Sequence, residues 1–291
     1  MTAFILVLAS CFAFVVLVFS SLSYAFFWFE AANSRHLDRL RDLSKGRIGR
    51  MMARGILASS LSLAFVLLTY PLGFSRSVRY SKTDPPCPSP PVIFVHGLYH
   101  NAGAWILFRR WFRAEGFRNI HALNYSSWNC SFHEILEQLD RLARQVTELS
   151  AGRPPVFVGH SLGGLLIRAY VDDPNRRSPV AAVVTLGTPH QGSKLAVLGL
   201  GRLAQSLRYK GPLIAEIERL PASPGIPRLA VYSPLDNMVL PAEASLTDRL
   251  EWTLHETSPI SHIAMLHHRP TAKLALEFIR NGSHGLAGLG K

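Results

Sequence analysis

A serine flanked by glycines stands between an apolar run and a helical run, and this segment restricts the fold more than any other. Residues 156–164 read VFVGHSLGG, and a run rich in Ala, Leu and Ile follows them. In a tight strand-to-helix turn, a side chain at Gly159 or Gly163 would collide with neighbouring backbone. The pattern therefore predicts that Ser161 is exposed at the end of a strand. The Leu162 amide then lies at the first turn of a helix, where it can stabilise a developing negative charge.

Short apolar runs alternate with amphipathic runs through the rest of the chain. The expected strands cover residues 91–96, 119–125, 156–158, 180–186, 228–232 and 250–254, and the expected helices cover 104–115, 132–149, 162–170 and 271–280. Strands that alternate with helices favour a parallel sheet covered on both faces. The expected architecture is α/β, with a mostly parallel sheet flanked by helices.

A serine hydroxyl is a weak nucleophile, so it needs a general base and a carboxylate that orients the base. Asp236 follows the strand at 228–232 in a turn-rich stretch, and we expect it to orient the base. His262 lies in the loop after the last strand, and we expect it to be that base. Several alternatives remain open. Glu243 and Asp248 could replace the acid, Asp172 and Asp173 are expected to be solvated helix ends, and the other candidate bases are His255, His267, His268 and His284.

A second amide donor is expected in the loop after the first strand. There Gly97 allows close approach to a substrate oxygen, and Leu98 supplies the amide, with Tyr99 as the alternative. No Cys and His spacing is typical of a zinc site, so neither a metal nor another cofactor is expected. The three cysteines do not suggest a disulfide framework, and we expect no bridge between Cys87 and Cys130.

Three motifs together resemble the α/β-hydrolase superfamily and, within it, bacterial triacylglycerol lipases and esterases. They are VHGL at 95–98, GHSLGG at 159–164 and GTPHQGS at 187–193. The last motif is similar to a turn of lipases and of membrane-bound inositol deacylases, in which the histidine is structural. The resemblance covers residues 90–280 and implies an acyl-serine intermediate. Few residues precede the first strand, so the sheet should be small and lack early antiparallel strands. Apolar residues 263–265 follow His262 where many relatives have a calcium ligand, so no calcium site is expected.

Two uncharged runs precede this domain. Residues 1–29 and 56–74 contain no Asp, Glu, Lys or Arg, and each can cross a hydrocarbon core of about 30 Å. We expect a transmembrane hairpin over 1–74, with a cleaved signal peptide and a buried soluble helix as the alternatives for the first and second runs. Residues 30–54 between the runs carry an excess of basic residues, which is typical of a cytoplasmic loop. A Pro-rich linker at 75–90 would then lead to a catalytic domain at 91–291. These features predict a multi-pass protein of a bacterial inner membrane with a periplasmic catalytic domain.

Charge and apolar content suggest the partners. The net charge of +12 fits attraction to anionic membrane lipids, and no motif of nucleic-acid binding is present. Residues 194–227 are rich in Leu and Ile and could form a lid over an acyl pocket, or could simply pack in the core. The main hypothesis is a membrane-tethered serine hydrolase of carboxylic, lipid or acyl esters. An acyltransferase with an alcohol acceptor and a non-catalytic membrane scaffold are the alternatives, and the sequence indicates no oligomeric state.

Overall fold

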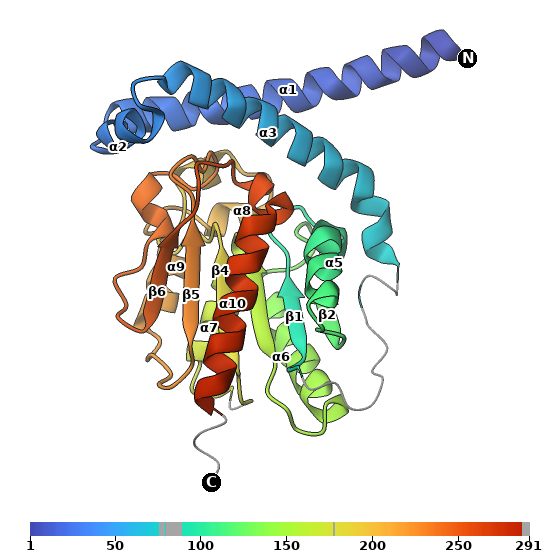
Figure 1. Cartoon of the computed structure of the whole chain (residues 1–291), viewed down its shortest axis with the longest axis vertical. Helices are drawn as coiled ribbons and strands as arrows, with labels where there is room; N and C mark the ends of the chain where they lie inside the picture. The colour runs from blue at the N-terminus through green and yellow to red at the C-terminus, as the bar shows by residue number, and fades with distance from the viewer. Residues whose placement is uncertain (76–78, 80–88, 177, 287–291) are drawn as a thin grey trace.

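A six-stranded parallel sheet forms the centre of the protein (Figure 1). The computed structural model describes the chain except residues 76–78, 80–88, 177 and 287–291 and the side chains of 283–286. The strands are β1 (Val92–Val95), β2 (Ile120–Leu123), β3 (Val156–His160), β4 (Ala182–Leu186), β5 (Arg228–Tyr232) and β6 (Trp252–Glu256). They pair in the order β2-β1-β3-β4-β5-β6, and every pair is parallel. Within the described residues no antiparallel strand precedes β1, so the predicted small, parallel sheet is confirmed.

Helices cover both faces of the sheet, which is why the inner strands are apolar on both sides. All residues of β1, β3 and β4 are buried. One face packs against α6 (Phe132–Leu149) and α7 (Leu162–Asp172). The other face packs against α5 (Ile106–Ala114) and α10 (Arg269–Leu286) (Figure 1). The helix predicted at 104–115 begins later as α5, because residues 102–105 form the 3-10 turn η2 (Ala102–Trp105).

The long helix α6 shows how local sequence sets an element that packs on the sheet. Ser131 accepts a hydrogen bond from the Glu134 amide, and the Glu134 carboxylate accepts one from the Ser131 amide. This reciprocal pair satisfies two of the backbone donors at the start of the helix. The apolar stripe of α6, including Ile135 and Leu139, is fully buried against the sheet.

The insertion between β4 and β5 forms three short elements, namely η3 (Lys194–Leu198), α8 (Arg202–Ser206) and α9 (Pro212–Arg219). Most of its apolar side chains are buried in the main core, namely those of Leu203, Leu207, Leu213, Ile214 and Ile217. Three apolar side chains remain exposed in a row before α8, at Val197, Leu198 and Leu200. Core packing therefore accounts for most, but not all, of the apolar excess of the segment. Three further 3-10 turns are η1 (Tyr70–Phe74), η4 (Ala242–Ser245) and η5 (Ile263–His267).

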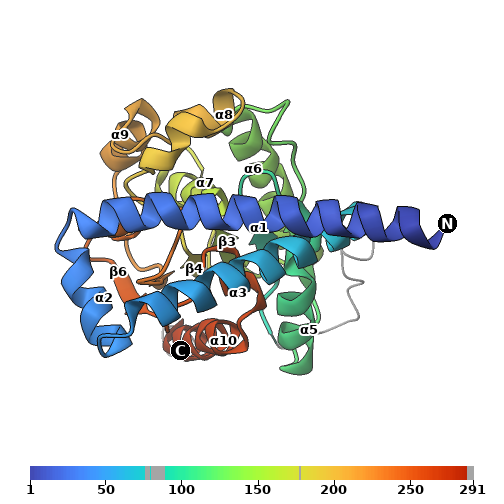
Figure 2. The same ribbon diagram turned by 90° about the horizontal axis from the view of Figure 1, so that it is seen from above.

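The apolar N-terminal segment forms α1 (Thr2–Ala32), the short α2 (His36–Ser44) and α3 (Ile48–Thr69). Thr2–Ala32 and Ile48–Phe74 are long and apolar enough to cross a membrane. In the structure, α1 and α3 lie side by side over the carboxyl ends of the strands, and the N-terminal end of α1 extends beyond the domain (Figures 1 and 2). Much of the outer surface of both helices is apolar and exposed.

The helix α2 contacts the domain that contains the sheet. His36 Nε2 lies 2.7 Å from the Pro234 carbonyl, and Arg39 pairs with Glu256 at 2.5 Å. Leu40 is fully buried in a small core that also contains Tyr24 and Leu235. The basic segment is thus on the same side of the two apolar helices as the domain that contains the sheet. The linker predicted at 75–90 lies mostly outside the described residues, as does Cys87, so the predicted absence of a Cys87–Cys130 bridge stays a prediction.

Candidate active site

The turn between β3 and α7 is the tight strand-to-helix turn that the sequence predicts. Ser161 has φ of 55° and ψ of −124°, a left-handed conformation that non-glycine residues rarely adopt. A Cβ at Gly159 would lie 2.7 Å from the Gly163 carbonyl carbon, and one at Gly163 would overlap the Val95 carbonyl oxygen. The predicted steric need for both glycines is confirmed. Gly164 has a similar role that the sequence did not suggest, because a Cβ there would overlap the Thr188 hydroxyl.

Asp236 and His262 form a buried pair, although they come from loops after different strands. Asp236 Oδ2 lies 2.7 Å from His262 Nδ1, and its Oδ1 accepts hydrogen bonds from the Met238 and Val239 amides at 2.8 and 3.0 Å. The two side chains are almost inaccessible to solvent. A carboxylate at Nδ1 favours the tautomer with a proton on that nitrogen, so Nε2 is left as an acceptor.

The turn after β4 contacts both Ser161 and the Asp–His pair. The Leu186 carbonyl accepts a hydrogen bond from the Ser161 amide at 2.9 Å, and the Thr188 hydroxyl donates to the Ser161 carbonyl at 3.1 Å. Between them, a Cβ at Gly187 would lie 3.1 Å from Asp236 Oδ2 and 3.2 Å from His262 Nδ1. The three predicted site residues therefore surround one short turn. The described residues show no hydrogen bond from Ser161 Oγ to His262 Nε2, a contact that is often long in unliganded enzymes and tightens with substrate.

The alternative residues lie elsewhere. The prediction that Asp172 is a solvated helix end is wrong. Its side chain is fully buried, and its Oδ1 pairs with Arg228 Nη1 at 2.8 Å. It balances the charge of a buried guanidinium, which is a structural role. Asp173 pairs with Arg176, while Glu243 and Asp248 are exposed. His255 lies within β6, His267 packs on Phe65, His268 contacts Thr271, and the side chain of His284 is outside the described residues.

Two backbone amides are available near Ser161. Within the described residues, neither the Leu98 nor the Leu162 amide donates a hydrogen bond. A Cβ at Gly97 would lie 3.0 Å from Ser161 Cβ, so the loop that carries Leu98 passes directly beside the serine. The alternative donor, the Tyr99 amide, already donates to Ser127 Oγ at 2.8 Å. The geometry thus favours Leu98 over Tyr99.

Buried neutral histidines support this arrangement. His160 precedes Ser161, and its Nε2 lies 3.1 Å from the His262 carbonyl. Burial holds the pKa of His160 well below its ordinary value, so the neutral ring can donate this hydrogen bond. Burial also lowers the pKa of His96 to about 4, and this ring stacks on Tyr125 with centroids 4.0 Å apart. Neither contact was predicted, because each joins a side chain to a residue remote in sequence.

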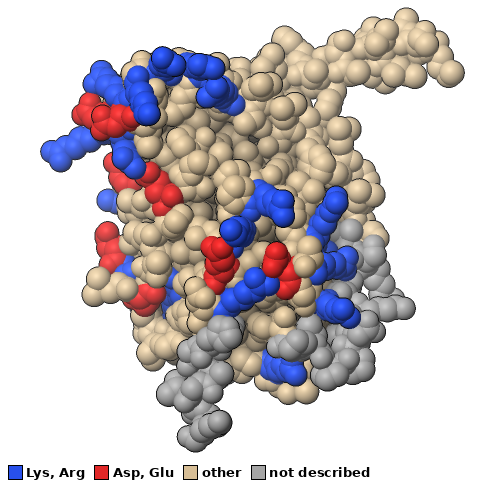
Figure 3. Space-filling model, viewed as in Figure 1, with Lys and Arg blue, Asp and Glu red and all other residues tan. Residues whose placement is uncertain are grey.

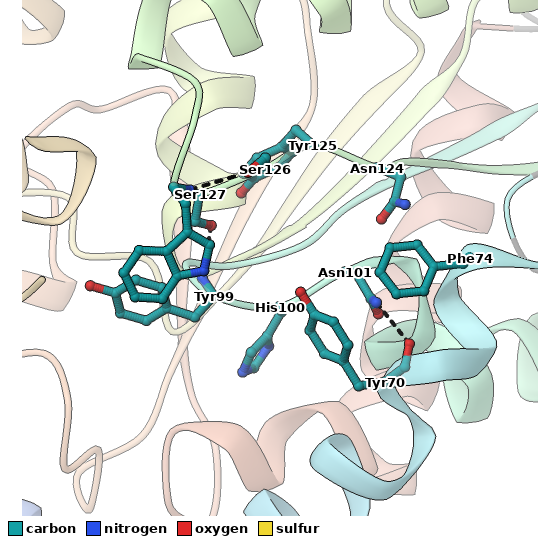
Figure 4. Close-up of a pocket in the computed structure, with 10 residues that line it drawn as sticks. Tyr70, Phe74, Tyr99, His100, Asn101, Asn124, Tyr125, Ser126 and Ser127 are labelled. Carbon is teal, nitrogen blue, oxygen red and sulfur yellow. Dashed lines mark hydrogen bonds between the residues drawn. The ribbon is translucent and has the colours of Figure 1, made fainter. Parts of the chain in front are cut away.

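A pocket of about 290 Å³ adjoins the loop that follows β1 (Figure 4). It is lined by Tyr70, Phe74, Tyr99, His100, Asn101, Asn124, Tyr125, Ser126, Ser127 and Trp128. Tyr70 and Phe74 of η1 face Tyr99 and Ser127 across it. Burial lowers the pKa of His100 to about 3, so none of these described lining groups carries a full charge near neutral pH. The pocket therefore suits a neutral group with both apolar and hydrogen-bonding parts.

Comparisons with known proteins agree with this fold. The model of the alpha/beta hydrolase family matches residues 92–281. The mature form of the lipase BlEst2 from Bacillus licheniformis superposes with a TM-score of 0.60 at 18% identity, over 69% of this chain and 96% of that one. Lipase B from Aspergillus fumigatus gives 0.53 at 17%, covering 65% and 51% of the two chains.

The protein Est1E from Butyrivibrio proteoclasticus is also similar, with a TM-score of 0.50 at 18% identity, over 69% of this chain and 98% of that one. No curated protein matches the sequence significantly. At these identities the likeness to solved structures shows the fold alone, whereas the family model covers well over half of the chain. The chain belongs to the alpha/beta hydrolase family.

Proposed function

We propose that the protein cleaves carboxylic esters, including lipid or acyl esters, through an acyl-Ser161 intermediate. The observation that carries the proposal is the buried Asp236–His262 pair, which contacts the same turn as the strained Ser161. The names of two similar proteins, a lipase from Bacillus licheniformis and lipase B from Aspergillus fumigatus, support an ester substrate.

In the first step, His262 Nε2 takes the proton of the Ser161 hydroxyl while Oγ attacks the ester carbonyl carbon. The oxyanion that forms accepts hydrogen bonds from the Leu98 and Leu162 amides. The carbon–oxygen bond to the alcohol then breaks, and the imidazolium of His262 protonates the leaving oxygen. Water then loses a proton to His262 and attacks the acyl carbonyl carbon. The bond from that carbon to Ser161 Oγ breaks, and the imidazolium of His262 returns the proton to Oγ as the carboxylic acid leaves. Asp236 holds the ring and stabilises the imidazolium throughout.

The order of the strands indicates where each half of the ester lies. His262 follows β6 and Ser161 follows β3, whereas the pocket of Figure 4 lies after β1 and β2, on the other side of the serine. The leaving oxygen must face His262 to receive its proton, so the acyl group extends toward the pocket. Its volume of about 290 Å³ is near the lower end of the range for small-molecule pockets, about 300–1,000 Å³, so it suits a medium acyl chain or a single ring.

A product assay tests the reaction type. The purified protein should release free acid from soluble esters, with kcat/KM rising up to a medium acyl chain and falling for longer ones. Trp128→Ala, which removes part of the pocket wall, should shift this preference toward longer chains. If the acyl group passes to an added alcohol and free acid does not form, the protein is an acyltransferase instead.

We also propose that α1 and α3 attach the protein to a membrane, since both are long enough and apolar enough. Lys and Arg gather over α2 and the start of α3, next to α1, in which Glu30 is the one charged residue (Figure 3). Such basic groups attract anionic headgroups. A hairpin that crosses the bilayer would place α2 opposite a periplasmic catalytic domain. The contacts of His36 and Arg39 with that domain weigh against this orientation. They favour a hairpin that lies along the domain, with the basic segment and the catalytic domain on one side.

A further inference from the structure

Asn237, which follows Asp236, lies where the apolar hairpin formed by α1 and α3 contacts the candidate active site. Its Nδ2 donates to Ser23 Oγ of α1 at 2.6 Å and to Ser59 Oγ of α3 at 3.5 Å. Its Oδ1 accepts a hydrogen bond from the His262 amide at 3.1 Å. One side chain thus joins both apolar helices to the backbone of the general base.

Hydrogen-bonding chemistry fixes the orientation of this amide. The His262 backbone N–H can only donate, so it must face the Asn237 oxygen, and the two N–H groups then face the serine hydroxyls. Ser23 donates its own proton to the Ser20 carbonyl at 2.8 Å, so its oxygen is free to accept from Asn237. Asn237 is 2% exposed, Ser23 6% and Ser59 3%. No water can replace a lost partner easily at such sites, so removal of one leaves a buried polar group unpaired.

The hairpin also contacts the two residues that precede Asp236 in the same loop. The Tyr24 hydroxyl donates to the Leu235 carbonyl at 3.2 Å, and His36 Nε2 lies 2.7 Å from the Pro234 carbonyl. Gly55 of α3 makes room for this contact, because a Cβ there would lie 2.5 Å from the Tyr24 hydroxyl oxygen. Contacts with the hairpin therefore occur immediately before and immediately after Asp236.

We propose that the apolar hairpin positions the catalytic Asp–His pair, with Asn237 as the positioning residue that connects Ser23 and Ser59 to His262. The proposal rests on the proposed function, because it assigns a role to residues around that same pair. The hairpin is then a working part of the active site in addition to any membrane attachment. A change in the packing of α1 and α3 alters the rate of the chemical step rather than the binding of substrate.

The test compares single variants of the full-length protein in detergent micelles, assayed with a soluble ester. Ser23→Ala removes the acceptor of Asn237, and Asn237→Ala removes the whole connection. Ser10→Ala makes the same change at an exposed position of α1 and is the matched control. Ser23→Thr keeps the hydroxyl. We expect Ser23→Ala to lower kcat by about tenfold with little change in KM, which is the effect of losing one buried hydrogen bond. Ser10→Ala and Ser23→Thr should retain wild-type kcat.

A double variant strengthens the comparison. Because both changes break one connection, Ser23→Ala combined with Asn237→Ala should have the kcat of Asn237→Ala alone. If Ser23→Ala does not show a cooperative melt, Ser59→Ala tests the same connection from α3. The proposal is overturned if the Ser23, Ser59 and Asn237 variants keep the kcat of Ser10→Ala, or if only KM changes. Absence of ester cleavage by the wild-type protein is a different result, which would refute the proposed function itself.

Discussion

Asp236 and His262 are held by different kinds of contact, and this difference decides what each substitution should do. The Asp236 carboxylate accepts two backbone N–H bonds in addition to its contact with His262, so its charge is stabilised although it is buried. His262 is fixed by its backbone as well, through Asn237 and His160. Contacts of the His262 side chain and of its backbone together fix the position of the ring.

Asp236→Asn should keep the shape of the loop but lower kcat by about 10⁴-fold. The new amide group can donate to Nδ1, which moves the ring proton to Nε2 and leaves His262 unable to take the Ser161 proton. Steady-state kinetics with a soluble ester measure the effect, and the exposed Asp248→Asn is the control. A kcat within tenfold of wild type would assign the acid to another residue.

The sequence predicted Ser161, Asp236 and His262 because their order along the chain and their places after strands follow from the topology of a parallel sheet. Their proximity in the structure agrees with that reasoning, while their catalytic roles stay predictions. Asn237 and His160 could not be predicted in this way. They act through hydrogen bonds to backbone atoms of residues far away in sequence, and a backbone contact leaves no pattern of residue types.

Among the elements, the insertion between β4 and β5 presents an exposed apolar ridge close to the pocket. Leu198 and Leu200 are 60% and 67% exposed, and the Leu200 carbonyl accepts a hydrogen bond from the Tyr99 hydroxyl at 2.5 Å. Tyr99 lines the pocket and packs on Trp128, with ring centroids 4.9 Å apart. We expect this ridge to contact a lipid surface from which the proposed substrate enters.

The double variant Leu198→Gln and Leu200→Gln should lower activity on an insoluble ester by roughly tenfold, since two exposed leucines together supply about 2–3 kcal/mol of apolar burial at most. Activity on the same ester below its solubility limit should not change. Leu250→Gln, at a residue that is 99% exposed on another part of the surface, is the control. Equal losses on soluble and insoluble substrate would exclude a role at an interface.

The bounds predicted for the long helix at 132–149 match α6, and those predicted for the inner strands differ by at most two residues at either end. The strands could be predicted because their continuous apolar runs are stable only inside a parallel sheet. The location of the two apolar helices, in a bilayer or on the protein surface, was harder to predict. An apolar run of that length fits a bilayer or a protein surface equally well, and hydropathy does not distinguish them. In the structure, α1 and α3 carry four buried serines on the faces that pack against each other or against the loop that contains Asp236. These are Ser20, Ser23, Ser59 and Ser62.

At the scale of the whole molecule, burial of neutral histidines couples folding to pH. Burial lowers the pKa of His96 and His267 to about 4 and of His100 and His190 to about 3, from 6.5. Below pH 6.5 the unfolded chain binds protons that the folded chain does not, so stability falls as the pH falls. The loss ends once the pH is below the folded-state values, where both states are protonated.

The free energy of unfolding should therefore decrease as the pH falls from 7 to 5. Well below pH 6.5, the decrease should approach about 1.4 kcal/mol per pH unit for each such histidine. Denaturant titrations at several pH values measure this slope. His190→Gln should make it shallower, and the exposed His133→Gln should not. A slope that is unaffected by His190→Gln would contradict the account of its burial.

The position of the basic segment relative to the membrane is also a property of the whole molecule. In a background without native cysteines, Lys45→Cys and Leu250→Cys report on α2 and the catalytic domain. A membrane-impermeant maleimide should label both positions from the same side, as the contacts between α2 and the domain require. Labelling from opposite sides would instead support a hairpin that crosses the bilayer.

The central claim is that Ser161 is a nucleophile activated by the Asp236–His262 pair. Covalent labelling by a fluorophosphonate, located by peptide mass analysis, tests it most directly. We predict a single adduct on Ser161, lost in Ser161→Ala, slowed strongly in Asp236→Asn and retained in Ser206→Ala. Absence of an adduct on the folded wild-type protein, or an adduct on another serine, would contradict the claim.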